Sequence, residues 1–207
     1  MAIQDIFAAV LDFEEDTIAG LVKAEIDSGS DLEDVLNNGL IAAMDEVGTK
    51  FSAGELFVPE MLMAAQTMKA GLDVLKPLLA EGASESRGTI VIGTVKGDLH
   101  DIGKNLVAMM LEGAGFDVVD LGVDVDTDAF IAAAAEHDAD AICMSALLTT
   151  TMPSMEATVK AIVEKGLPYK AMVGGAPVTD AFAKKIGANY SEDAPSAVEL
   201  ARKLIAA

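Results

Sequence analysis

The stretch TIVIGTVKGDLHDIGKN, residues 89–105, decides the fold of the second part of the chain. It starts as a run of β-branched and apolar residues over 89–95, which is typical of a buried parallel strand. A polar loop with glycine follows, and a helical pattern begins near residue 103. Strand, loop and helix together form the first unit of an alternating pattern.

Three more strand-like runs follow this unit, at 116–122, 141–147 and 170–175. Helical patterns lie between and after the strands, near 103–114, 127–137, 153–165, 179–186 and 195–206. This alternation predicts an α/β domain, a doubly wound parallel sheet with helices on both faces. We expect a Rossmann-like (flavodoxin-like) domain over 89–207, with its ligand at the carboxyl ends of the strands.

Residues 1–80 are expected to be helical. Two short helices are predicted at about 3–11 and 14–28, followed by two longer ones. The longer helices each carry an apolar stripe with helical spacing, formed by Leu32, Val35, Leu36, Leu40, Met44 and Val47, and by Met61, Ala64, Ala65, Met68, Leu72, Leu75 and Leu79. Ser30 and Glu33 are expected to form a capping box. The pattern predicts an N-terminal four-helix bundle, and 81–88 is expected to be a linker.

The composition narrows the classes of partner. Asp and Glu total 34 against 14 Lys and Arg, a net charge of −20, so we expect no nucleic-acid partner and no binding to anionic membranes. No apolar run reaches the roughly 18 residues of a membrane span, and the start lacks a basic signal-peptide region. Cys143 is the single cysteine and is expected to be a core thiol. We expect a cytoplasmic protein.

The loop KGDLHDIGKN, residues 96–105, follows the first strand and lacks the usual nucleotide-binding motifs. Asp98 and His100 lie two residues apart in it, and a metal-bound imidazole commonly donates its other N–H to a carboxylate. Gly97 and Gly103 would let the backbone approach a bulky ligand. The alternative is a surface turn in which Asp98 caps the helix that begins near Ile102.

Two other strand ends carry polar or small residues. Ser145, Thr149, Thr150 and Thr151 place hydroxyls where the third strand ends, and hydroxyls there can bind a polar ligand tail. Ser154 and Thr151 are alternatively expected to cap the next helix. Gly174 and Gly175 follow the fourth strand and either let a flat ligand lie against the backbone or form an ordinary turn.

The three loops together form the pattern D-x-H-x-x-G, S-x-L and G-G, with 41 residues between Gly103 and Ser145 and 26 between Leu147 and Gly174. This pattern resembles the cobalamin-binding signature of the corrinoid proteins of methyltransferase systems and of the cobalamin-binding module of methionine synthase. The resemblance covers the whole chain, including the helical cap that precedes the sheet domain.

The resemblance implies a cobalamin or related corrinoid cofactor, with His100 as the lower ligand of cobalt. Asp98 would accept the second N–H of His100, and Thr151 stands where methionine synthase has a serine that extends this relay. The implied cofactor contacts are Gly97, Asp98, His100, Asp101, Ile102, Gly103, Ser145, Leu147, Thr149, Gly174, Gly175, Tyr190 and Asp193. Over the upper face, the resemblance implies Phe57 and Met61, with Ala65, Val58 or Met63 as further candidates, and bundle core is the alternative for Met61.

By resemblance the chain is a non-catalytic methyl carrier, with methylcobalamin as its loaded state. Its implied partners are a substrate-specific methyltransferase, a second methyltransferase that uses tetrahydrofolate or coenzyme M, and a reductive activator. Methylamines, quaternary amines, methanol and methoxylated aromatics fit equally as methyl donors. The alternatives are a cobalamin-dependent sensor or regulatory protein, a mutase subunit, and a flavodoxin-like binding domain without a corrinoid.

Overall fold

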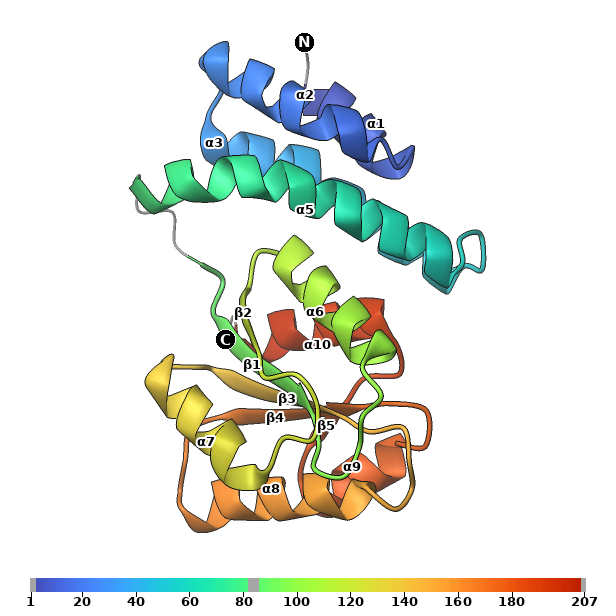
Figure 1. Ribbon diagram of the computed structural model, residues 1–207, viewed down its shortest axis with the longest axis vertical. Helices are drawn as coiled ribbons and strands as arrows, with labels where there is room; N and C mark the ends of the chain where they lie inside the picture. Colours follow the sequence, from blue (N-terminus) through green and yellow to red (C-terminus); the bar gives the residue numbers. More distant parts are fainter. Residues whose placement is uncertain (1–2, 82–85, 206–207) are drawn as a thin grey trace. The chain divides into compact units, whose positions relative to one another are not determined.

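The computed structural model describes residues 3–81 and 86–205, which divide into two compact units, one helical and one built on a sheet (Figure 1). Residues 82–85 of the linker expected over 81–88 lie outside the described residues. The helical and sheet architecture confirms the predicted fold class.

The helical unit contains the predicted helices, and the third of them departs from regular α geometry. Its elements are α1 (Ile3–Leu11), α2 (Glu15–Asp27), α3 (Leu32–Asp34), the π-helix η1 (Val35–Ile41), α4 (Ala42–Ser52) and α5 (Val58–Glu81). Helix α3, the π-helix η1 and α4 form one continuous helical run. Within it the Ala42 amide donates to the Asn37 carbonyl, five residues back. This wider turn lets Val35 and Leu40, also five residues apart, both be fully buried.

The predicted capping box at this run is wrong by one residue. Asp31 is the N-cap, and its carboxylate accepts hydrogen bonds from the amides of Glu33 at 2.8 Å and Asp34 at 3.2 Å. Ser30 instead donates its hydroxyl to Glu25 of α2, at 2.8 Å. A carboxylate in extended backbone immediately before the first turn reaches the orphan amides directly, which leaves Ser30 for a contact between neighbouring helices.

The sheet unit has five parallel strands in the order β2-β1-β3-β4-β5. The strands are β1 (Thr89–Thr94), β2 (Asp117–Asp120), β3 (Ala141–Ser145), β4 (Lys170–Gly174) and β5 (Asn189–Tyr190). The first four were predicted, whereas β5, a two-residue edge strand beside Met172 and Val173, was not. The strand order is that of flavodoxin-like folds.

Helices cover both faces of this sheet, as predicted (Figure 1). They are α6 (Ile102–Gly113), α7 (Thr127–Glu136), α8 (Met152–Glu164), α9 (Asp180–Ile186) and α10 (Ala194–Ile205). Helices α6 and α10 lie on one face, and α7, α8 and α9 lie on the other. On the latter face Val91, Ile142 and Val173 of the strands pack with Phe130 of α7 and Val159 of α8. Cys143 in β3 is buried and unpaired with another cysteine, which confirms the core-thiol prediction.

The topology opens a site between β1 and β3. Their last residues, Thr94 and Ser145, are paired in the parallel register, while the chain leaves β1 toward α6 and leaves β3 toward α8 on opposite faces. At such a switch point the two loops diverge, and ligands of doubly wound sheets bind in the gap at the strands' carboxyl ends.

Candidate functional site

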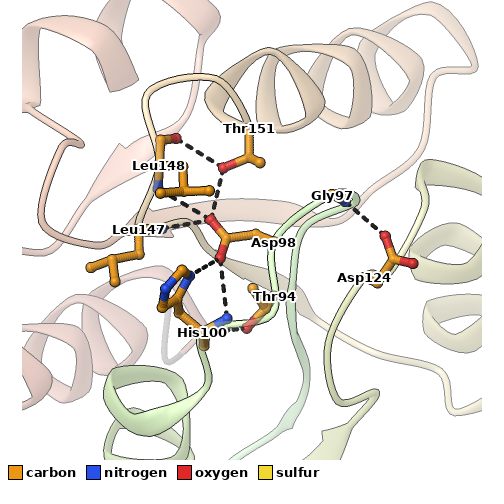
Figure 2. Close-up of polar contacts among 8 residues, drawn as sticks. All are labelled: Thr94, Gly97, Asp98, His100, Asp124, Leu147, Leu148 and Thr151. Carbon is orange, nitrogen blue, oxygen red and sulfur yellow. Dashed lines mark hydrogen bonds and ion pairs between the residues drawn. The ribbon is translucent and has the colours of Figure 1, made fainter.

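The loop that follows β1 holds a fully buried carboxylate, Asp98 (Figure 2). One of its oxygens, Oδ1, accepts hydrogen bonds from the amide of His100 at 3.1 Å and from Nδ1 of the same histidine at 2.7 Å. The turn depends on Gly97, whose φ of +84° lies in the left-handed region that glycine adopts at little cost. Asp98 therefore holds both the backbone and the imidazole of His100.

The other oxygen of Asp98 reaches across the switch point to the loop that follows β3. There Oδ2 accepts hydrogen bonds from the amides of Leu147 at 2.8 Å and Leu148 at 3.2 Å, and from the Thr151 hydroxyl at 2.8 Å. Figure 2 shows these donors converging on the carboxylate, with the Thr151 hydroxyl also 2.8 Å from the Leu148 carbonyl. Asp98 thus ties together the two loops between which a ligand is expected.

The environment of Asp98 favours its charged form. Burial by itself would raise the pKa of this carboxyl, but the hydrogen bonds from the His100 ring, the Leu147 amide and Thr151 outweigh burial and hold the pKa well below its usual range. Asp98 is therefore an anion at neutral pH, and an anion only accepts hydrogen bonds. It follows that Nδ1 of a neutral His100 carries the ring proton.

His100 is consequently held in the tautomer that suits metal binding. With the proton on Nδ1, the lone pair of Nε2 is available, and no hydrogen bond to Nε2 is formed by the residues that the structure describes. The side chain is 50% exposed. The Thr94 hydroxyl donates to the His100 carbonyl at 2.9 Å, which gives the backbone of His100 a second anchor.

The same edge of the sheet gathers most of the other residues implied by the resemblance. Ser145 is the last residue of β3 and pairs in register with Gly174 of β4. Gly175 has a φ of +122°, and a Cβ there would lie 2.0 Å from the Ala146 carbonyl oxygen, so no other residue fits. Leu147 and Thr149 follow on the exposed β3 loop. The carboxyl ends of β1, β3 and β4 are therefore brought together.

Helix α6 begins beside His100 with a partly apolar surface. Asp101 precedes its first turn and accepts a hydrogen bond from the Asn105 side chain at 3.2 Å, and Gly103 is open to solvent with nothing near the position of a Cβ. Leu99 and Ile102 flank His100 in the sequence and are 71% and 72% exposed. Large apolar side chains exposed together beside one histidine indicate a surface that a ligand covers.

Two predicted tail contacts have structural partners of their own. Asp193 caps α10, since its carboxylate accepts the Ser196 amide at 2.8 Å while its own amide donates to the Ser196 hydroxyl at 3.0 Å. Tyr190 lies in β5, half-buried, and burial together with the nearby carboxylate of Glu192 raises its pKa. Neither arrangement tests a contact with a ligand.

Phe57 and Met61 belong to the helical unit and differ in exposure. Phe57, immediately before α5, is 65% exposed, whereas Met61 is fully buried. Of the further candidates, Ala65 is buried and Val58 and Met63 are exposed. Their placement over a ligand stays a prediction.

Two expectations for the β3 loop were wrong. Ser154 and Thr151 do not cap α8 with their side chains. Their hydroxyls are directed to the β1 loop, where Ser154 donates to the Lys96 carbonyl at 3.2 Å and Thr151 donates to Asp98. The Leu147 and Leu148 amides were also missed as donors, since a backbone group leaves no signal in the residue type. Asp124, which contacts the β1 loop, was missed as well, although it is charged and follows the end of a strand.

The described residues lack two further kinds of feature. No group of three or more His, Cys, Asp or Glu side chains among them is arranged to hold a metal ion. In the same part of the chain no helix combines the length and the apolar character needed to cross a membrane.

Two family models match this chain, both described as a B12 binding domain, over residues 88–199 and residues 2–76. The chain belongs to the B12-binding corrinoid proteins. This corrinoid protein is 43% identical over 203 residues to a corrinoid protein of Desulfitobacterium hafniense, covering 95% of this chain and 94% of the relative. It is 45% identical over 211 residues to the dimethylamine corrinoid protein of Methanosarcina barkeri, covering 99% and 97%.

A solved structure agrees with these relatives. A chain of the methanol:cobalamin methyltransferase complex of Methanosarcina barkeri matches this corrinoid protein with a TM-score of 0.87 at 32% identity, over 99% of this chain and 79% of that one. The comparisons confirm the resemblance and the expected cofactor, cobalamin or a related corrinoid.

The residues of the sheet edge fit such a cofactor. A corrin ring supplies its own nitrogen ligands to cobalt, so one imidazole with an available Nε2 is a sufficient protein ligand. The exposed Leu99 and Ile102 offer apolar contact to a macrocycle. Gly174 and Gly175 carry no side chain because Ser191 and Ala146 already fill the positions of their Cβ atoms.

Proposed function

We propose that this corrinoid protein carries methyl groups between methyltransferases, with Nε2 of His100 as the lower ligand of cobalt. The observation that carries the proposal is the Asp98–His100 pair, in which a buried, ionised carboxylate holds Nδ1 at 2.7 Å and leaves Nε2 available on a half-exposed ring. When bound, the corrinoid supplies the cobalt on which a methyl group is gained and lost.

The names of the relatives support the choice of partner. One is a dimethylamine corrinoid protein, and the matching solved chain belongs to a complex with a methanol:cobalamin methyltransferase. We infer that this chain delivers and receives methyl groups through two separate methyltransferases. One is specific for the methyl donor and the second uses tetrahydrofolate or coenzyme M, and a reductive activator serves the same chain.

Asp98 and Thr151 act on His100 rather than on the metal. The carboxylate keeps the proton on Nδ1, so that Nε2 is unprotonated when it binds cobalt. The Thr151 hydroxyl and the Leu147 and Leu148 amides hold the other oxygen of Asp98, which keeps the carboxylate from turning away.

The remaining residues of this edge are proposed to shape the surface for the cofactor. Gly97, Asp101, Ile102 and Gly103 would contact the lower side of the macrocycle. The tail would lie along the ends of β3 and β4, with contacts from Ser145, Leu147, Thr149, Gly174, Gly175, Tyr190 and Asp193. Phe57 and Met61 of the helical unit are the candidates for covering the methyl-bearing face. The exposure of Phe57 supports its part in this, whereas the full burial of Met61 favours its alternative as bundle core.

The test replaces His100, the proposed cobalt ligand, and measures which nitrogen is bound to cobalt. Protein uniformly labelled with nitrogen-15 is loaded with unlabelled hydroxocobalamin, desalted, reduced to Co(II) and examined by electron paramagnetic resonance. A protein nitrogen ligand splits the signal into doublets, whereas nitrogen-14 of the cofactor's own base gives triplets. We expect about one corrinoid per chain and doublets for the wild type, and loss of the doublets in His100→Ala.

The chain supplies a matched control in its other histidine. His137 is exposed at the end of α7, so His137→Ala is expected to keep the doublets. Doublets that survive in His100→Ala, or triplets in the wild type, would show that His100 is not the ligand. A folded wild type that retains no corrinoid would refute the carrier function as well.

A further inference from the structure

Asp124, in the loop after β2, contacts the backbone of the β1 loop at two points. Its Oδ1 accepts a hydrogen bond from the Gly97 amide at 2.7 Å, and its own amide donates to the Asp98 carbonyl at 3.0 Å. The two contacts lie on either side of the peptide group that joins Gly97 to Asp98. Figure 2 shows Asp124 beside Gly97, on the side of Asp98 away from His100.

The carboxylate of Asp98 is held by its own hydrogen bonds, but the backbone that leads into it has few other contacts. Gly97 and Lys96 are exposed, and the left-handed φ of Gly97 belongs to a residue with many accessible conformations. Among the described residues, the other backbone contacts of residues 96–98 are the Asp98 amide to the Val95 carbonyl at 3.1 Å and the Ser154 hydroxyl to the Lys96 carbonyl at 3.2 Å. The Lys96 side chain also pairs with Asp126 at 3.5 Å, on the exposed surface. None of these contacts involves the Gly97 amide or the Asp98 carbonyl, the two groups that Asp124 contacts.

Asp124 has an unusual backbone conformation, and the residues on both sides of it are anchored. Its φ of +57° is left-handed, which aspartate and asparagine tolerate better than other non-glycine residues. On either side the chain is anchored, because the Gly122 carbonyl accepts the Thr94 amide at 2.9 Å and the Val125 amide donates to the Thr94 carbonyl at 3.0 Å. The carboxylate thus projects from a fixed point toward Gly97.

We propose that Asp124 is a positioning residue for His100: by clamping the Gly97–Asp98 backbone it fixes the direction of the Asp98 carboxylate and, through it, of the His100 ring. The inference rests on the proposed function, since it concerns His100 as the cobalt ligand. Asp124 makes no contact with His100 itself among the hydrogen bonds and ion pairs that the described residues form.

The test compares three variants by competition for the lower ligand position. Asp124→Gly keeps the left-handed backbone and removes the acceptor, Asp124→Asn keeps both, and Asp128→Asn removes an equal charge from an exposed side chain four residues away. Each nitrogen-15 protein, loaded and in the Co(II) form, is titrated with unlabelled imidazole. Doublets from His100 give way to triplets from the competitor, and the midpoint concentration measures the strength of His100 ligation.

We expect the midpoint for Asp124→Gly to fall about three- to tenfold, the effect of one hydrogen bond, and the other two variants to match the wild type. An unchanged midpoint in Asp124→Gly, or an equal fall in Asp124→Asn or Asp128→Asn, overturns the inference while His100 remains the ligand. Wild-type protein without doublets would instead refute the proposed ligand itself, so the two failures are distinguishable.

A second measurement on the wild type does not depend on a variant folding. The Gly97 amide belongs to an exposed residue, so only its bond to Asp124 protects it from exchange with solvent. We expect hydrogen–deuterium exchange at this amide to be at least about tenfold slower than in an unstructured peptide. Exchange at the unprotected rate would overturn the clamp.

Discussion

At the scale of single residues, one carboxylate organises the site, and its charge is what the arrangement depends on. Asp98→Asn keeps the shape but offers one acceptor oxygen and one NH₂ group. Three donors face Oδ2, so the oxygen of the substituted amide would be drawn there and its NH₂ group would face Nδ1 of His100. Nδ1 would then have to accept, the ring proton would move to Nε2, and Nε2 would no longer be able to bind a metal.

The variant Asp98→Asn is therefore expected to lose His100 ligation and about 2–4 kcal/mol of stability, because hydrogen bonds to a charged group are lost in a buried place. The pKa of Asp98 is lowered in the folded state, so its contribution is present above the unfolded value near 3.9 and is lost as pH falls below that value. Urea unfolding of both proteins should show a constant difference from about pH 7 to about pH 5 that shrinks toward about pH 3.

A variant of Thr151 separates the effect of the charge on Asp98 from the effect of the number of hydrogen bonds that Asp98 accepts. Thr151→Val removes one of the five donors to Asp98 but leaves the carboxylate charged, so it should keep the nitrogen-15 doublets and most of the stability. If Asp98→Asn also keeps the doublets, the carboxylate does not set the tautomer.

At the scale of elements, periodicity located the helices and the four longer strands to within a few residues, because burial of one face imposes a regular pattern. The parts that it missed are set by local contacts. The strand β5 has two residues, too few for any period, and exists because Asn189 and Tyr190 pair with β4. The π-turn of η1 is invisible to a pattern that assumes 3.6 residues per turn.

The site could be predicted to a similar extent. The alternation of strands and helices indicated which strand ends meet, since parallel strands place their carboxyl ends together. The resemblance then singled out Asp98, His100 and Ser145 among the residues of these loops. The donors from Leu147 and Leu148 could not be predicted, because an amide carries no sequence signature. Asp124 was missed because its role depends on a backbone angle.

Strand β3 carries a testable group in its interior, the Cys143 thiol. Burial raises the pKa of this thiol to about 12, whereas an unfolded cysteine ionises near 8.5. Above the unfolded value, the unfolded state therefore releases a proton that the folded state keeps, and stability is lost as pH rises. We expect the stability of the wild type relative to Cys143→Ala to fall by about 2 kcal/mol between about pH 8 and about pH 10.

Chemical denaturation of both proteins at a series of pH values measures this loss of stability. The rate at which a thiol reagent reacts with Cys143 in the folded protein is a companion measurement. The cavity made by Cys143→Ala costs the same at every pH, so only the slope bears on the thiol. A pH-independent difference between the two proteins would show that Cys143 is ionised as easily in the folded state as in the unfolded chain.

At the scale of the whole molecule, we expect the excess of negative charge to oppose folding more than the ion pairs favour it. The chain has a net charge of −20, while surface pairs such as Lys23–Asp27 and Lys160–Glu164 join side chains that are mostly exposed and contribute little. Between about 0.01 M and about 1 M NaCl the Debye length falls from about 30 Å to about 3 Å, which screens repulsion and attraction alike. With this excess of carboxylates we expect repulsion to have the larger sum, so screening should stabilise the fold.

The apparent Tm is therefore expected to rise over this range, by about 2–4 °C for each kcal/mol of repulsion removed. Scanning calorimetry of the corrinoid-free chain measures it, and the same experiment at about pH 5, where neutralisation of some carboxylates reduces the net charge, should show a smaller rise. If salt instead lowers Tm, attractive pairs such as Lys104 with Asp120 outweigh the excess of carboxylates. The excess of carboxylates would then cost the fold no stability. Its role would instead lie in attracting a partner of opposite charge, and the rate of association with that partner should fall over the same salt range.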